Sequence, residues 1–92
     1  MKTNRFIHIM HAMVDNEVVK FESEDGTRLE VHKSSDTFYT LTTKSRQDRM
    51  MSAVFFNRVE DDGGAIRLCW DDSIVGMAFP VAFEVESESI YS

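Results

Sequence analysis

Apolar and polar residues alternate most regularly between Glu17 and Lys33, with a break at Glu24-Asp25-Gly26. A three-residue hairpin loop closes with one residue in the left-handed conformation, which glycine adopts without strain, and Gly26 stands at that place. The register that this loop sets matches apolar with apolar and acidic with basic residues: Phe21 with Leu29, Val19 with Val31, Glu22 with Arg28, and Lys20 with Glu30. Such cross-strand pairs favour one register over its neighbours. The pattern therefore predicts an antiparallel hairpin over residues 17–33.

Three later segments also have strand-like patterns. Residues 37–43 and 65–70 are rich in aromatic, β-branched and threonine residues, which are typical of strands. After Pro80, apolar residues alternate with alanine and glutamate from Val81 onward, as in a strand with one solvent-exposed face. We therefore expect a strand in each of these segments.

Residues 6–14 carry apolar side chains on both alternating sets of positions. This pattern fits either a central strand or a short buried helix. The β-branched and aromatic start, Phe6-Ile7-His8-Ile9, favours the strand.

Residues 46–59 have the pattern of an amphipathic helix. Ser45-Arg46-Gln47-Asp48 resembles a helix N-terminus with a capping serine and an acid three residues later. Met50, Met51, Val54 and Phe55 then fall on one side of a helix, although Phe56 does not. The alternative is a strand over 53–60 that turns at Asp61-Asp62-Gly63-Gly64 into the strand at 65–70.

Together these elements predict an α+β fold: a mostly antiparallel sheet of five or six strands with one helix at about 46–59. If that helix is not formed, the alternative is a small all-β barrel. The chain has 92 residues and contains no stretch rich in proline, glycine and serine that would mark a linker. We therefore expect a single compact domain over residues 1–92.

The charge is negative and unevenly distributed. The chain has 16 Asp and Glu residues against 10 Lys and Arg residues, and all of the resulting charge of −6 lies in residues 47–92. Such a chain lacks the cations that neutralise phosphates, so we expect no direct binding to nucleic acid and no adsorption to an anionic membrane. The single cysteine, Cys69, cannot form an internal disulfide and fits a reducing compartment. We expect a cytoplasmic protein of a bacterial or virus-infected cell.

The acidic residues of the second half are the candidate partner-binding residues: Glu84, Glu86, Glu88, Asp71, Asp72, Asp61 and Asp62. Because alternate residues of a strand lie about 6.8 Å apart, the three glutamates are expected to form a row of negative charges. Such a row resembles the regularly spaced charges of a nucleic acid strand and could compete for a basic groove. Acids on the outer face of a strand also keep a protein soluble and discourage edge-to-edge pairing, so both interpretations stay open.

This surface predicts a non-enzymatic, acidic protein-binding module that docks on a basic protein surface, such as that of a nucleic-acid-handling complex. Its properties suit an inhibitor that mimics nucleic acid, for example a phage-encoded anti-defence or anti-CRISPR-type protein. The alternative is a small structural or assembly subunit that forms a homo-oligomer, such as a homodimer, through an apolar sheet face or an exposed edge strand. A further alternative is a metal-binding module that uses aspartates and histidines.

The sequence contains no motif that indicates catalysis. His8 and His11 have a metal-like spacing on a helix but point to opposite faces of a strand, and His32 falls on the polar face of the predicted hairpin. No Cys-x-x-Cys, His-Glu-x-x-His, Gly-x-Ser-x-Gly or phosphate-binding glycine loop is present. We expect neither an enzyme nor a metal site, and no cofactor.

Overall fold

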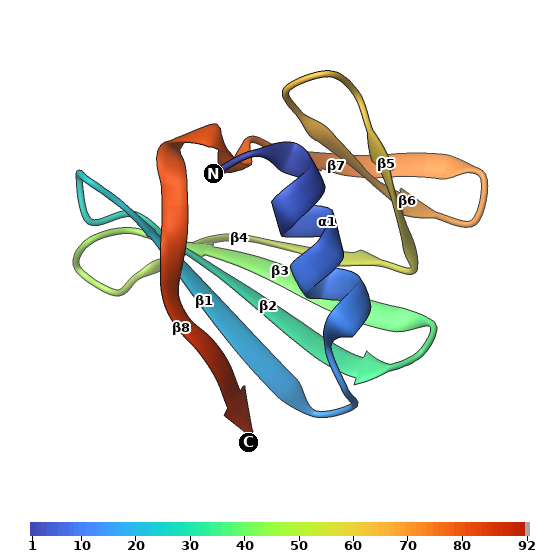
Figure 1. Cartoon of the computed structure of the whole chain (residues 1–92), viewed down its shortest axis with the longest axis horizontal. Coiled ribbons are helices and arrows are strands. Elements are labelled where there is room, and N and C mark those ends of the chain that lie inside the picture. Colours follow the sequence, from blue (N-terminus) through green and yellow to red (C-terminus); the bar gives the residue numbers. More distant parts are fainter. Residues whose placement is uncertain (92) are drawn as a thin grey trace.

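The computed structural model describes the backbone of residues 1–91 and the side chains of residues 1–85. In this part of the chain one α-helix precedes eight strands, and a short 3-10 helix lies before the last strand (Figure 1). The elements are α1 (Thr3–Ala12), β1 (Glu17–Ser23), β2 (Arg28–Ser35), β3 (Phe38–Lys44), β4 (Met50–Phe56), β5 (Arg58–Asp61), β6 (Ile66–Trp70), β7 (Ser73–Ala78), η1 (Pro80–Ala82) and β8 (Phe83–Tyr91). The fold is α+β and mostly antiparallel sheet, as predicted, although the described residues form eight strands in two sheets and not one sheet of five or six strands.

The strands form two antiparallel sheets. The larger sheet has the order β4-β3-β2-β1-β8, and the smaller sheet has the order β5-β6-β7. In Figure 1, α1 crosses one face of the larger sheet, and the smaller sheet lies at the β4 side of the molecule. The alternative prediction of an all-β barrel is wrong, because the described strands remain in two separate open sheets. The predicted strands at 37–43 and 65–70 are confirmed as β3 and β6, and the strand expected after Pro80 begins at Phe83, as β8.

The hairpin of β1 and β2 has the predicted register. All four predicted pairs are present: Phe21 with Leu29, Val19 with Val31, Glu22 with Arg28, and Lys20 with Glu30. The Ser23 backbone N–H donates to the Thr27 carbonyl at 2.9 Å, which leaves a three-residue loop. Gly26 lies in the left-handed region at φ +88°, and a Cβ at this position would lie 2.8 Å from the Cβ of Arg46. Both the backbone conformation and the close approach therefore require glycine.

The prediction of a strand at residues 6–14 is wrong, because Thr3–Ala12 forms the helix α1. Phe6 and Met10 are one helical turn apart and are both fully buried, whereas His8 and His11 of the same helix are exposed. Apolar residues occur at both odd and even positions of this segment because they follow the helical period. The β-branched isoleucines favoured a strand and so obscured this period. Tertiary packing decides the outcome, since the inner face of the larger sheet is buried by this helix.

The predicted helix at about 46–59 is also wrong. The alternative of a strand is correct in type, but the single strand over 53–60 is divided at Asn57 into two strands of different sheets. Residues 45–49 form a turn in which the Arg49 N–H donates to the Ser45 hydroxyl at 3.3 Å, and Asp48 has a φ of 64°. The residues that follow form β4 and β5. Phe56, which did not fit the helix pattern, is completely buried, whereas Met51 is 65% exposed. Alternation by two, not the helical period, therefore describes this segment.

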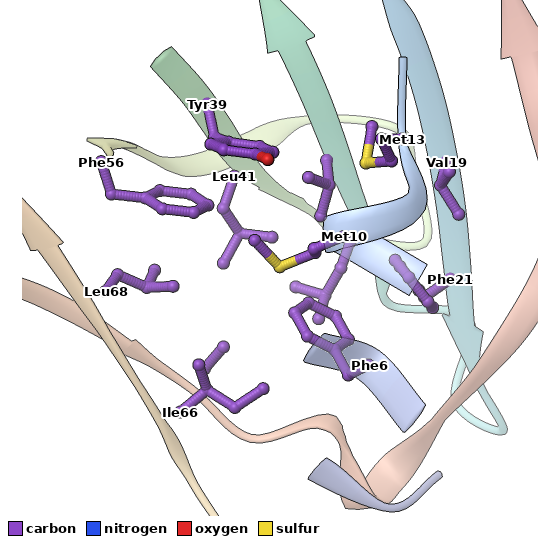
Figure 2. Close-up of a cluster of buried hydrophobic side chains, with 13 residues drawn as sticks. Phe6, Met10, Met13, Val19, Phe21, Tyr39, Leu41, Phe56, Ile66 and Leu68 are labelled. Carbon is purple, nitrogen blue, oxygen red and sulfur yellow. The ribbon is translucent and has the colours of Figure 1, made fainter. Parts of the chain in front are cut away.

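The core lies between α1, the inner face of the larger sheet and β6 (Figure 2). The ring centroids of Phe6 and Phe21 are 4.8 Å apart, so the helix contacts β1 directly. Tyr39 of β3 stacks on Phe56 of β4 with centroids 5.4 Å apart. Figure 2 shows the sulfur of Met10 among these side chains, where a flexible residue fills an irregular gap.

Two buried charged residues hold the connection between α1 and β1. The Glu17 carboxylate accepts a hydrogen bond from the Val14 backbone N–H at 3.0 Å. The Lys33 ammonium donates to the Met13 carbonyl at 2.8 Å and lies 3.6 Å from the Asp36 carboxylate. These partners satisfy polar groups whose burial would otherwise be unfavourable.

The last strand, β8, is irregular. Its register against β1 shifts twice, between Phe21 and Lys20 and between Lys20 and Val18. Such bulges interrupt the alternation of a strand and increase its twist. The regular alternation that the predicted row of glutamates requires is therefore interrupted after Val85.

Candidate functional site

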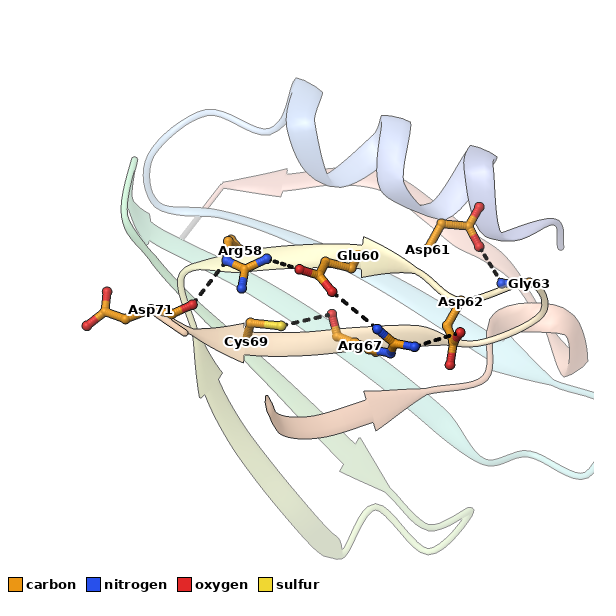
Figure 3. Close-up of polar contacts among 8 residues, drawn as sticks. All are labelled: Arg58, Glu60, Asp61, Asp62, Gly63, Arg67, Cys69 and Asp71. Carbon is orange, nitrogen blue, oxygen red and sulfur yellow. Dashed lines mark hydrogen bonds and ion pairs between the residues drawn. The ribbon is translucent and has the colours of Figure 1, made fainter. Parts of the chain in front are cut away.

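The aspartates of the predicted partner-binding set lie at the two ends of β6. Asp61 and Asp62 stand where β5 turns into β6, and Asp71 and Asp72 stand where β6 turns into β7. Figure 3 shows Asp71 at one end of this hairpin and Asp61 and Asp62 at the other. The structure therefore separates the two pairs by the length of a strand.

Arginines neutralise part of the acidic charge along this hairpin (Figure 3). Arg67 lies 2.9 Å from Asp62 and 3.5 Å from Glu60, and Arg58 also pairs with Glu60. The hydrogen bond between Arg58 and Glu60 raises the pKa of the guanidinium and lowers the pKa of the carboxyl group. Glu60 and Asp62 thus belong to an internal ion-pair network on the surface of the smaller sheet.

Asp71 and Asp72 form no ion pair with a described residue. The Asn57 side-chain amide donates to the Asp71 carboxylate at 2.9 Å, and the Asp71 N–H donates back to the Asn57 side chain at 3.0 Å. Asn57 directly follows β4. These two hydrogen bonds therefore place the exposed acidic turn at the end of β4.

Glu84 lies among acids of the first hairpin that the sequence analysis did not associate with it. It pairs in register with Glu22, and both residues line a hollow of about 610 Å³ together with Glu24 and Asp25. The Met1 ammonium lies 3.5 Å from the Glu84 carboxylate, which is 82% exposed. The side chains of Glu86 and Glu88 lie outside the described residues, so the predicted row of three glutamates stays a prediction.

Asp25 in this hollow is held in its charged form. The Ser23 hydroxyl and the Thr27 backbone N–H both donate to its carboxylate, the latter at 2.9 Å, and lower its pKa to about 2. The cause is hydrogen bonding to the anion, because Asp25 is fully exposed.

The histidines do not converge on one site. His8 and His11 have helical spacing on α1, and His32 is half-buried on the outer face of the larger sheet, between Val18 and Thr40. Among the residues whose side chains are described, no three His, Cys, Asp or Glu residues lie close enough together to hold a metal ion. Cys69 is buried and unpaired.

The structure assembles an exposed apolar surface that the sequence analysis missed. We call it the β4 surface, and its members are Met50, Met51, Ala53 and Phe55 of β4, with Phe38 and Trp70 beside them. Met50 and Met51 are each 65% exposed, and Phe55 is 56% exposed. The prediction of a helix hid this surface, since it placed Met50, Met51 and Phe55 on a buried side. The alternation of the strand alternative was the signal that could have found it.

Three aromatic rings contact one another in the β4 surface. The ring centroid of Phe38 lies 5.6 Å from that of Phe55 and 5.7 Å from that of Trp70. A shallow cleft of about 570 Å³ lies among these rings, and Ser73 and Val75 complete its lining. The rings support one another while their outer faces remain open to a ligand.

The backbone of β4 adds a second binding feature. β4 is the terminal strand of the larger sheet, so the N–H and C=O groups of its outer edge have no neighbouring strand within that sheet. The strand reads Met-Met-Ser-Ala-Val-Phe-Phe and contains no charged residue and no proline. An uncharged edge strand of this kind can accept another strand by hydrogen bonding.

Comparison with protein-family models, with curated proteins and with solved structures finds no match to this chain. Within the described residues, no helix has the length and apolar character needed to cross a membrane. The function is therefore inferred from the surfaces themselves.

Proposed function

We propose that this protein is a non-enzymatic protein-binding module, and that it binds an extended polypeptide segment of a partner along the edge of β4. The observation that carries this proposal is the uncharged edge strand beside the exposed rings of Phe55 and Trp70, which the half-buried Phe38 joins. In strand addition, backbone hydrogen bonds supply affinity, and alternate side chains of the peptide enter neighbouring apolar sites. The expected ligand is a strand with apolar residues at alternate positions.

The exposure of the aromatic side chains supports the same interpretation. Aromatic residues, tryptophan above all, are enriched among the residues that contribute most to binding at protein interfaces. Trp70 is 39% exposed, and it is held by an edge-on contact with Phe38. A preorganised aromatic side chain loses little conformational freedom when a partner covers it.

A synthetic peptide tests this proposal directly. The probe is a soluble peptide in which valine and lysine alternate, added to dilute protein whose backbone amides are followed by NMR. We expect the amide signals of residues 50–55 to shift, with an affinity lost on Ala53→Lys, because the added charge lies on the exposed edge strand. The matched control is the same peptide N-methylated at alternate positions, which removes the donors that strand addition requires.

Equal binding of the methylated and unmethylated peptides would contradict strand addition. Shifts confined to residues outside β4 and the aromatic rings would place the site elsewhere. Absence of binding by either peptide would also count against the proposal.

A second candidate function is the one expected from the charge: an acidic module that docks on a basic protein surface. The observation that favours it is the hollow where Glu84 joins Glu22, Glu24 and Asp25. An acidic surface of this kind speeds association with a basic partner and selects among partners. Glu86 and Glu88 are included in this proposal only because of their positions in the sequence. A partner that handles nucleic acid, a role as a phage-encoded inhibitor, and action in the cytoplasm stay predictions.

Charge reversal tests this second candidate. The probe is a lysine-rich peptide, and the variant replaces Glu84, Glu86 and Glu88 by lysine. We expect the wild-type protein to bind with an affinity that falls as salt is added, and the variant to lose this binding. The control reverses Asp71 and Asp72 at the far end of the molecule. Unchanged affinity in the glutamate variant, with no response to salt, would end this proposal.

A further inference from the structure

We propose that the partner at the β4 edge is a second copy of this chain, and that two β4 strands pair antiparallel about a twofold axis. The inference rests on the proposed function, because it names the ligand of that same edge. Two larger sheets then join into one continuous sheet of ten strands. Both subunits use the same surface, as a twofold interface requires.

The charges at the two ends of β4 are complementary. Arg49 directly precedes β4, is exposed and forms no ion pair with a described residue. At the other end, Asn57 follows β4 and holds the carboxylate of Asp71, with Asp72 beside it. An antiparallel pair brings the arginine end of each strand to the aspartate end of the other. Each copy thus supplies an ion-pair partner for carboxylates that form no ion pair within the described part of their own chain.

The apolar side chains are also self-complementary. Ala53 and Phe55 are exposed at alternate positions of β4, and Met51 is exposed where the pairing with β3 shifts register. With Ala53 nearest the axis, Met51 of one copy faces Phe55 of the other, and the contact occurs twice. Methionine sulfur packs favourably at aromatic rings, and the small alanine side chain allows the two strands to approach at the axis.

The opposite edge of the sheet explains why association stops at two copies. After β4 pairs, the free edges of the ten-stranded sheet are the two β8 strands. Each β8 carries Glu84, Glu86 and Glu88 in its sequence, and its pairing with β1 contains two register shifts. Charges and bulges both oppose the addition of another strand. A closed dimer, not a growing fibril, is the expected product.

Sedimentation equilibrium tests the dimer, and two lysine substitutions on opposite edges provide the comparison. We expect a wild-type species of twice the 10.6 kDa mass of the chain. Ala53→Lys is expected to raise the dimer dissociation constant by more than about tenfold, since it places two positive charges beside the axis. Glu84→Lys on the β8 edge is the matched control and is expected to leave the dimer intact. Circular dichroism of both variants checks that they fold.

A cysteine variant gives an independent measurement. Ala53→Cys is expected to form a disulfide between two chains under mild oxidation, because the axis brings the two side chains together. Glu84→Cys is the control and is expected to remain reduced, as is the wild-type protein, whose Cys69 is only 1% exposed.

A wild-type monomer, or a dimer that Ala53→Lys leaves unchanged, would overturn the proposal. If the protein is monomeric and the valine–lysine peptide still binds at β4, the second copy is wrong and the proposed function stands. If neither the peptide nor a second copy binds there, both are wrong.

Discussion

The two edges of the larger sheet differ in charge and in how often their pairing shifts register. The β4 edge has seven uncharged residues, with Met50 and Met51 each 65% exposed. The β8 edge carries three glutamates in its sequence and two shifts of register against β1. Natural sheets protect their edges with charges and bulges. The pairing of β8 has two register shifts and its sequence has three glutamates, whereas β4 has one shift, at its Met50 end, and no charge. The difference supports the proposal that β4 binds another strand while β8 stays free.

The comparison also separates two kinds of surface. At β4, apolar side chains and open backbone groups can form a buried interface, in which most of the binding energy comes from desolvation. Near β8, acidic side chains of the first hairpin line a hollow. Charges on a surface affect the rate of association and the choice of partner more than the affinity. Three further measurements examine the β4 side and the β8 side separately. The largest expected effect, on the free energy of unfolding, comes first.

The β4 surface can serve binding only if it is not needed for folding. Phe56→Ala is expected to lower the free energy of unfolding by about 3–5 kcal/mol, because its ring is fully buried and stacks on Tyr39. Phe55→Ala, on the opposite face of the same strand, is expected to lower it by less than about 1 kcal/mol. Urea denaturation of both variants in the Ala53→Lys background measures this difference without a contribution from association. Equal losses would show that Phe55 is part of the core.

The acidic hollow on the β8 side depends on the loop of the first hairpin. Gly26→Ala is expected to lower the free energy of unfolding by about 2 kcal/mol, because alanine opposes the positive φ and its Cβ meets the Cβ of Arg46. Gly64→Ala is the matched control, since no atom lies within 4 Å of the added Cβ. Its effect on the same free energy is expected to stay below about 1 kcal/mol. Thermal and urea unfolding of the two variants give the comparison. A neutral Gly26→Ala would mean that the loop has another conformation.

The smallest effect is expected from the titration of Asp25. Its folded pKa of about 2 lies below the ordinary value of 3.8, so its contribution to stability is complete above pH 4. That contribution is lost as the pH falls from about 4 to about 2, when the carboxylate becomes protonated. NMR of the Asp25 carboxyl carbon is expected to show a midpoint near the low value, and Ser23→Ala is expected to raise it. A wild-type midpoint near 3.8 would contradict the hydrogen bonds from Ser23 and Thr27.

The first hairpin shows why part of the fold could be predicted. Its register depends on residues close in sequence: a loop of three residues, a glycine at the left-handed position, and pairs such as Phe21 with Leu29. Short-range interactions favour the same answer as the hydrophobic pattern, so local reasoning was sufficient. β3 and β6 were predicted for the same reason, since their composition and their alternation agree.

Two segments were predicted as the wrong kind of element, a helix as a strand and a strand as a helix, and they show where local reasoning fails. Residues 3–12 contain β-branched residues yet form a helix, because Phe6 and Met10 bury against the larger sheet. Residues 50–56 have a helix-like start and yet form a strand, because β3 supplies backbone partners from Tyr39 to Lys44. Both outcomes depend on contacts with elements distant in the chain. The intrinsic helix and strand propensities of the residues are too weak to oppose these contacts.

The candidate site also has a part that the sequence predicts and a part that depends on contacts between distant residues. The acidic second half is visible in composition, but the pairing of Glu60 and Asp62 with Arg67 depends on strand register. The β4 surface combines Phe55 with Trp70, which are 15 positions apart in the chain. No local pattern brings these two rings together.

The amino-acid sequence by itself determined the charge and the register of the first hairpin, because each depends on composition or on residues a few positions apart. Only the tertiary structure decided which segment is the helix, which aspartates are paired and which strand ends the sheet. Those properties depend on which surfaces remain to be covered after the strands have paired. An edge is a property of the whole sheet, since a strand has a free side only when no other strand lies beside it.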